Sequence, residues 1–428
     1  MGLWLFGARE RSVPLWGMRA MERISQASGP HFLPHSGFGL IKFIRDGIMQ
    51  RLMAKLFCVV FILVGFLMIA DPLTAMQKPA EAIHKLRQRC LAILYHAIES
   101  ENAFIRGAAA RAAGESEDPE LIPLLKKAAT DAYHTTRLFA LQGFKNFAPE
   151  SAAVTAKSLI DDHNVWVKSA ALEMLGDLGR HEARDRIRAK LKSPDRPVRL
   201  SAAAALYKLG EKEHLSIVLD TLKDSNSVTR YQAIGYIGKM QSRELLPHLI
   251  ALLDDREDEV IFYSLKAIGK MVEPQLFPRL VELTFSEHSS VKYQAVLVMG
   301  YLPANIALNR VRELCTDADP MVRVSAAVSM NRLGSTGCRE VFAQELEHSD
   351  YGVRSSTARV MGKIDLPDRA RLLDRALNDE NTRVRTAGVR AVGMMGGPEA
   401  FPLLVRMLDD PQEAVRAYAA GNLIKLTQ

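Results

Sequence analysis

Apolar and small residues recur along this chain with a period of 31 residues. One position marks each period, and it is usually a Val followed by Arg or Lys. It falls at Ile105, Thr136, Val167, Val198, Thr229, Val260, Val291, Val322, Val353, Val384 and Val415. We call this position the register residue and count offsets from it. Eleven positions in unbroken 31-residue steps indicate a solenoid of stacked helical units.

Each repeat carries two helical patterns. After the register residue, offset 4 is always small and offset 5 is always apolar, and most repeats are also apolar at offsets 8 and 11. These offsets share one helix face. A second apolar series precedes the register residue, as at Leu249 and Leu253, and predicts another helix. No stretch alternates as a strand would, so we expect an all-α fold of eleven helical hairpins. Gly at offset 9 in seven repeats, including Gly238 and Gly300, predicts close packing there, because mid-helix Gly costs about 1 kcal/mol.

This pattern resembles the HEAT-repeat family, in the short form found in phycobilisome-lyase-like proteins. The resemblance covers residues 89–428. It implies an α-α superhelix (a HEAT-like solenoid) in which one helix of each pair lines a concave face. With helices 8–10 Å apart, the array should extend roughly 100 Å. Such repeats specify a fold more than a function.

The N-terminal part predicts export. Residues 57–70, FCVVFILVGFLMIA, carry no charge, follow Arg51 and Lys55, and precede a small-residue LTA. This is the layout of a secretory signal, and it is short for a bilayer span. We therefore expect 1–48 to be disordered or upstream of the true start, 49–75 to be a signal peptide or signal anchor, and 76–88 to be a linker. The repeats would lie in the periplasm or cell envelope of a bacterial-type cell, with 56–70 as the alternative anchor.

Charge argues against nucleic acid as the partner. Residues 1–55 hold eight basic and three acidic side chains, or +5 of the total +7, so the remaining chain carries only +2. Cys90, Cys315 and Cys338 follow the leader without metal-ligand spacing. We interpret them as small hydrophobic residues, not as a metal site or a disulfide.

Basic and acidic residues recur in register. The residue after the register position is basic in ten repeats, and Asp often stands five before it. We predict a structural ladder in which Asp accepts from backbone N–H groups at the second helix's start and Arg ties neighbouring turns. A track for a polyanion is the alternative. The ladder residues are Arg199, Arg230, Arg323, Arg354, Arg385, Arg416, Asp162, Asp255, Asp317, Asp379 and Asp410.

The sixth repeat breaks this rule. Ile261 takes the basic position, and offset 2 becomes aromatic in three successive repeats. Stacked aromatics with nearby lysines suggest a strip that binds a protein partner, although the same positions would also suit packing between repeats. The candidate residues are Tyr231, Phe262, Tyr263, Tyr293, Lys266 and Lys270.

The sequence gives little support for an enzymatic function. Deoxyhypusine hydroxylase shares this repeat class and holds iron with several His-Glu pairs, whereas this chain has only His181-Glu182. We assign no catalytic, metal or cofactor-binding residue. We expect a monomeric, non-catalytic scaffold or adaptor that binds other proteins outside the cytoplasm. A phycobilisome-lyase-like or hydroxylase-like enzyme is the alternative.

Overall fold

The computed structural model describes residues 72–428, with side chains from residue 81 onward except at 146. Residues 1–71, which include most of the expected leader, lie outside this part. The first helix, α2 (Pro72–Ile98), runs through residues 76–88, for which a linker was expected. Within residues 72–428, no helix is both long and apolar enough to cross a membrane.

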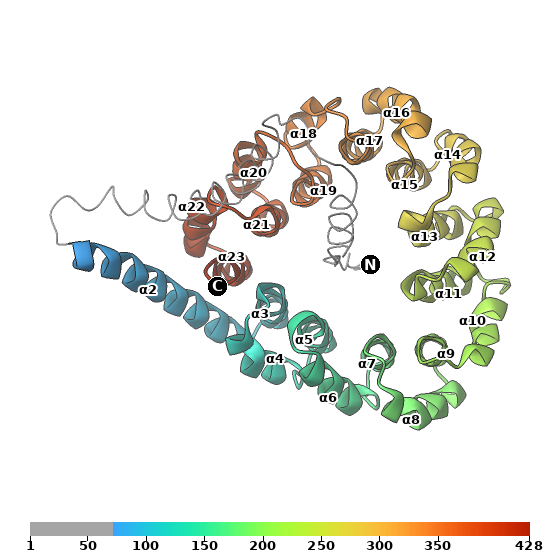
Figure 1. Cartoon of the computed structure of the whole chain (residues 1–428), viewed down its shortest axis with the longest axis horizontal. Coiled ribbons are helices and arrows are strands. Elements are labelled where there is room, and N and C mark those ends of the chain that lie inside the picture. Colours follow the sequence, from blue (N-terminus) through green and yellow to red (C-terminus); the bar gives the residue numbers. More distant parts are fainter. Residues whose placement is uncertain (1–71) are drawn as a thin grey trace, which may run out of the picture. The chain divides into compact units, whose positions relative to one another are not determined.

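The predicted all-α superhelix is confirmed, with eleven helix pairs over residues 72–428 and no strand there. The second helix of each pair lies on the inside and the first on the outside (Figure 1). The outer helices are α2, α4 (Ile122–Ala128), α6 (Pro149–Leu159), α8 (Arg184–Ala189), α10 (Leu215–Thr221), α12 (Leu246–Ala251), α14 (Phe277–Leu283), α16 (Ala304–Glu313), α18 (Glu340–Glu345), α20 (Arg369–Leu377) and α22 (Ala400–Arg406). The inner helices are α3 (Ala103–Ser116), α5 (His134–Phe147), α7 (Val165–Asp177), α9 (Arg196–Lys208), α11 (Ser227–Met240), α13 (Asp258–Ile268), α15 (Ser289–Met299), α17 (Pro320–Arg332), α19 (Tyr351–Met361), α21 (Thr382–Met395) and α23 (Glu413–Leu426).

The inner helices start at a fixed place because the sequence supplies a cap there. The residue three before the register position is the N-cap of all eleven, and Asn or Asp side chains at several of these positions accept backbone N–H groups. In α7, for example, the Asn164 side chain accepts from the amides of Trp166 and Val167. Such a cap stabilises a helix by about 1 kcal/mol. The small side chains at offset 4 are buried throughout, so the two helices of a hairpin approach closely.

Glycine at offset 9 marks the contacts between neighbouring inner helices. A Cβ on Gly176 would lie 2.7 Å from the Cα of Ala205, at offset 7 of the next repeat. The same close approach to the offset-7 residue of the next repeat occurs at Gly114, Gly238, Gly300, Gly362 and Gly393. The predicted close packing is thus confirmed in six of seven cases. Gly269 is the exception: it ends α13 with φ +42° and has nothing within 4 Å of its Cβ position.

The solenoid closes on itself, because the last inner helix packs against the first. The α23–α3 contact is as extensive as the closest contacts between consecutive inner helices (Figure 1). A Cβ on Gly421 of α23 would lie 2.6 Å from the carbonyl oxygen of Ala112 of α3. Ala112 is the offset-7 residue of its repeat. The closing contact therefore involves the same offset that offset-9 glycines contact between consecutive repeats. The sequence predicts an array that extends roughly 100 Å, and it does not predict that the small rotation of each repeat brings the two ends together.

Cys315 and Cys338 form a disulfide, which corrects their interpretation as unlinked hydrophobic residues. Cys315 ends the outer layer of the eighth repeat, and Cys338 precedes α18 in the ninth. Stacking of these repeats brings the two Cα atoms to 5.9 Å, within the usual range for a disulfide. Cys90 is the unpaired third cysteine. It is fully buried, and burial raises the pKa of its thiol to about 12.

Candidate binding face on the inner helices

The aromatic residues singled out in the sequence form a continuous ladder across three inner helices. Tyr231 of α11 stacks on Tyr263 of α13, with ring centroids 4.8 Å apart. Phe262 contacts Tyr263 edge-on at 5.1 Å and reaches Tyr293 of α15 at 5.9 Å. All four side chains are half-buried: they pack against the core and still present a surface. The alternative for this strip was packing between repeats in the core. The four side chains are only partly buried there, so they remain accessible to a partner.

Two lysines extend the aromatic ladder toward the C-terminal end of α13. The Nζ of Lys266 lies 5.9 Å from the ring centroid of Tyr263. Burial lowers the pKa of Lys266, because a charged ammonium loses hydration there. Lys270 follows one turn later and is exposed. The six residues chosen from the sequence are thus brought together on adjoining inner helices, as a surface that combines aromatic rings with positive charge.

The Arg–Asp pairs lie at the junctions between repeats. Arg137 shows the full pattern: its Nε and Nη2 donate to both carboxylate oxygens of Asp162 in the next repeat, at 2.8 and 2.7 Å. Its Nη1 donates to the carbonyls of Asp131 and Ala132 in the loop before its own helix. Asp162 also accepts from the amide of Asn164. The arrangement recurs, with the same side-chain pairing, in Arg106–Asp131, Arg230–Asp255, Arg354–Asp379 and Arg385–Asp410.

The remaining ladder residues have other partners, at Arg199 even though Asp224 stands at the position of the expected carboxylate. Arg323 binds Glu345, because His348 stands at the position where Asp would be. The Oδ2 atom of Asp317 lies 3.9 Å from the Nζ of Lys292. Arg199 donates to the carbonyls of Ser193 and Pro194, and Arg416 to those of Asp410 and Pro411. Between the sixth and seventh repeats Ile261 leaves no such pair, and the Phe262–Tyr293 contact spans that junction instead.

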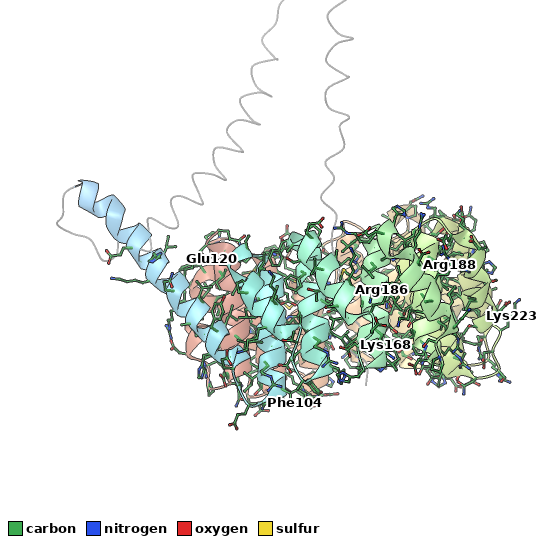
Figure 2. All side chains as sticks on the ribbon, turned by 90° about the horizontal axis from the view of Figure 1, so that it is seen from below. Phe104, Glu120, Lys168, Arg186, Arg188 and Lys223 are labelled. Carbon is green, nitrogen blue, oxygen red and sulfur yellow. A yellow bond between two sulfur atoms is a disulfide. The ribbon has the colours of Figure 1, made fainter. Side chains whose placement is uncertain are left out.

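Besides Lys266 and Lys270, four further cations occupy offsets 6 and 10 in the eighth to tenth repeats, and the sequence pattern did not single them out. These offsets carry Lys266 and Lys270 in the sixth repeat, then Arg332, Arg359, Lys363 and Arg390. The basic residues recur visibly at these two offsets, but the near-neutral net charge of the repeats as a whole does not indicate them. Many outer cations are paired with carboxylates: Arg186 and Arg188 of α8, labelled in Figure 2, bind Asp161 and Glu211.

Side chains of the inner face also fasten the closure. Arg390 of α21 reaches past α23 to Glu115 of α3, with its Nε 3.1 Å from the carboxylate, and Arg111 binds the same carboxylate at 3.0 Å. Burial alone would raise the pKa of Glu115, but the two guanidinium groups outweigh it and lower this pKa. Lys425 of α23 binds Glu117 at 3.2 Å.

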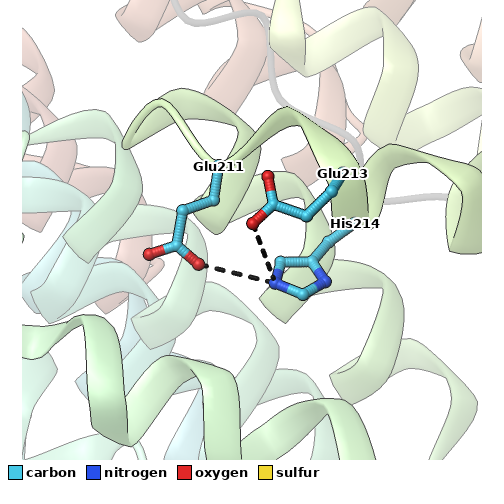
Figure 3. Close-up of side chains that lie close together, drawn as sticks. All are labelled: Glu211, Glu213 and His214. Atoms are coloured by element: carbon cyan, nitrogen blue, oxygen red, sulfur yellow. Dashed lines mark ion pairs between the residues drawn. The ribbon is translucent and has the colours of Figure 1, made fainter.

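One cluster between α9 and α10 has the composition of a metal site. Glu211, Glu213 and His214 lie together there, with His214 Nε2 3.4 Å from Glu211 Oε2 and 3.9 Å from Glu213 Oε1 (Figure 3). Arg188 already donates to Glu211 at 2.7 Å, which opposes a cation. We assign no metal to it. The His181-Glu182 pair lies apart from the inner face, and Glu182 binds Lys157 of α6 at 2.8 Å.

Comparison with solved structures finds other helical solenoids at low similarity. Human deoxyhypusine hydroxylase in complex with glycerol is 19% identical, with a TM-score of 0.29, over 59% of this chain and 98% of that one. Kap121p bound to Nup53p is 13% identical, with a TM-score of 0.37, over 77% of this chain and 44% of Kap121p. An engineered protein is 16% identical, with a TM-score of 0.28, over 81% of this chain and 99% of that one. None of these likenesses is close enough to indicate a function.

No curated protein matches the sequence. The model of HEAT repeats matches residues 122–206, 152–234, 185–269, 215–288 and 339–424, more than half of the chain in total. These matches agree with the 31-residue period, the eleven helix pairs and the inner and outer layers. The chain belongs to the HEAT-repeat family.

Proposed function

We propose that this protein is a non-catalytic scaffold that binds another protein through the inner face of its closed solenoid. The observation that carries the proposal is the half-buried aromatic ladder of Tyr231, Tyr263, Phe262 and Tyr293. Half-buried aromatic side chains offer large contact area at little cost in side-chain entropy, and they are enriched where proteins bind each other. The solenoid supports them rigidly, because the neighbouring repeats and the α23–α3 contact hold the inner helices in place.

We further propose that the repeats work outside the cytoplasm. Two observations support this location: the leader-like pattern of residues 49–75, and the Cys315–Cys338 disulfide. Disulfides persist in oxidising compartments and are rare in the cytosol. The test is fractionation of the native cells, followed by mass spectrometry of the alkylated chain. Recovery of an unprocessed, cytosolic chain with reduced thiols would contradict export.

Affinity capture with matched variants tests the binding role. The protein would be captured from envelope extract as wild type, as Phe262→Ala/Tyr293→Ala, and as the control Phe285→Ala. Phe285 follows outer helix α14 and is 69% exposed, so its loss removes an aromatic side chain away from the inner face. We expect one defined set of proteins to be captured by the wild type and the control and lost with the inner-face variant. Equal capture by all three chains would contradict the proposal.

A further inference from the structure

Four successive inner helices lack acidic residues altogether. Helices α15, α17, α19 and α21 contain no Asp or Glu, yet each carries basic side chains. Part of this charge belongs to the junctions, where Lys292, Arg323, Arg354 and Arg385 face carboxylates of the next repeat. The residues at offsets 6 and 10 are not part of these junction pairs. Their charge is therefore carried by the inner face itself.

Three of these inner cations contact uncharged groups, whereas Arg390 is paired with Glu115. Arg332 donates to the carbonyl of Leu297 at 3.2 Å, and its guanidinium lies 4.4 Å from the ring centroid of Tyr301. Arg359 donates to the hydroxyl of Ser356 at 3.2 Å. Lys266 lies over a tyrosine ring, as described above. A carbonyl, a hydroxyl and a ring each stabilise a cation, but none neutralises it.

The same cations repel one another across the inner face. The pKa of Lys363 is lowered by burial and by repulsion from Arg332, Arg390, Arg359 and Lys270. Burial also lowers the pKa of Arg359, with further repulsion from Arg390 and Arg111. These groups come from the sixth, eighth, ninth, tenth and first repeats, so the curvature of the solenoid concentrates their fields. A bound anion would relieve this repulsion and would be held more strongly than on an open surface.

Resting on the proposed protein-binding function, we propose that the partner binds through an acidic segment laid along α13, α15, α17 and α19. Its carboxylates would pair with Lys266, Lys270, Arg332 and Arg359, and its apolar side chains would lie on the aromatic ladder. The chain's own N-terminal segment does not suit this surface, because residues 1–55 carry +5. Nucleic acid suits it less well: a strand offers a phosphate about every 3.4 Å, whereas repeats 8–10 Å apart offer at most two of these cations each, and the seventh repeat offers none.

The test measures binding of a fluorescently labelled acidic probe to the purified repeat protein by anisotropy. The probe is a peptide of about 21 residues that repeats the triplet Glu-Glu-Phe, and a single-stranded DNA of equal charge serves as competitor. The inner variant is Arg332→Gln/Arg359→Gln. The control, Arg186→Gln/Arg312→Gln, removes the same charge from outer helices α8 and α16. Arg359→Lys tests rescue by charge, and circular dichroism of each variant tests folding.

We expect the peptide to bind the wild type and the outer control equally and to bind the inner variant about tenfold more weakly. Binding should weaken as salt rises, and Arg359→Lys should retain most of the affinity. Absence of peptide binding, equal binding by the inner variant, or stronger binding of DNA at equal charge would overturn the inference. These results are independent of the capture experiment. That experiment tests the proposed function by replacing only the aromatic residues Phe262 and Tyr293.

Discussion

At the scale of single residues, glycine placement sets how closely the inner helices approach. Gly176 meets Ala205 so closely that even one added methyl group would overlap backbone atoms, whereas Gly235 on α11 has nothing within 4 Å of its Cβ position. The sequence alone predicted the contacts of offset-9 glycines, because a residue that costs helix stability is retained seven times in register. It did not predict the exception at Gly269, which depends on where α13 ends.

These two glycines should respond in opposite directions to the same change. Gly176→Ala should lower the free energy of unfolding by about 1–3 kcal/mol, since the methyl group must push α7 and α9 apart. Gly235→Ala should raise it by about 0.5–1 kcal/mol, because alanine favours helix and meets no obstacle. Urea unfolding followed by circular dichroism measures both values. A stabilised Gly176→Ala variant would show that the two helices are not in contact.

At the scale of helices and junctions, each repeat is tied to the next by buried ion pairs. Arg230 and Asp255 are both largely buried, with 6% and 10% of their side chains exposed. Arg199 occupies the equivalent position one repeat earlier but donates only to carbonyls among its hydrogen bonds. The sequence predicted that these residues are structural, and it could not predict the substitute partner Glu345, which comes from a different turn of the next repeat.

Removing the arginine should therefore cost more at Arg230 than at Arg199. Arg230→Leu leaves the Asp255 carboxylate buried without a counter-charge, for which we expect a loss of about 3–5 kcal/mol. Arg199→Leu removes hydrogen bonds to carbonyls and should cost about 1 kcal/mol. Equal losses in urea unfolding of the two variants would argue against a buried pair at Arg230.

The junction pairs also predict a dependence on pH. Burial alone would raise the pKa of Asp379, but hydrogen bonds from Arg354 and the amide of Asn381 lower it below its ordinary value of 3.8. A lowered folded-state pKa gives stability that is complete above pH 3.8 and is lost as pH falls through the folded-state value. The stability difference between wild type and Asp379→Asn should thus shrink as pH falls below 3.8. A difference that stays constant from pH 7 to pH 2.5 would contradict the pairing.

The disulfide links the eighth and ninth repeats covalently, in addition to the Arg323–Glu345 ion pair between them. It closes a loop of 23 residues, which corresponds to about 3 kcal/mol by the loop-entropy estimate. Cys315→Ala/Cys338→Ala should lose this stabilisation, and reduction of the wild type should give the same unfolding midpoint as the variant. Wild-type stability that does not change on reduction would contradict the link. Sequence spacing did not reveal the pair, because the two cysteines occupy different offsets in successive repeats.

At the scale of the whole molecule, closure turns a row of repeats into an inner and an outer surface. The 31-residue period predicted the fold, the number of repeats and the aromatic strip. Closure could not be predicted, because it depends on the sum of eleven small rotations and on two residues, Gly421 and Ala112, that are far apart in the chain. The cation cluster depends on closure and curvature in turn, because these bring offsets 6 and 10 of distant repeats toward each other.

Chemical cross-linking across the seam tests closure. Lys425 and Glu117 form an ion pair of 3.2 Å although they are 308 residues apart. In Lys425→Cys/Glu117→Cys, a short bismaleimide should join the two thiols within one chain and speed its migration in a denaturing gel. Cys58 lies outside the described residues and is replaced by Ser in this variant. The remaining native cysteines should not interfere, since Cys90 is buried and Cys315 and Cys338 are bonded. Cross-links that form only between chains would indicate an open solenoid.

The central claim is that the inner face of the closed solenoid contacts a protein partner. Its most direct test is photo-cross-linking in the native cells, with a photoreactive amino acid placed at Phe262 on the inner face or at Phe285 on the outer layer. We expect a discrete protein adduct from position 262 and none of the same mass from position 285. An adduct from position 285 alone, or the same adduct from both positions, would contradict it.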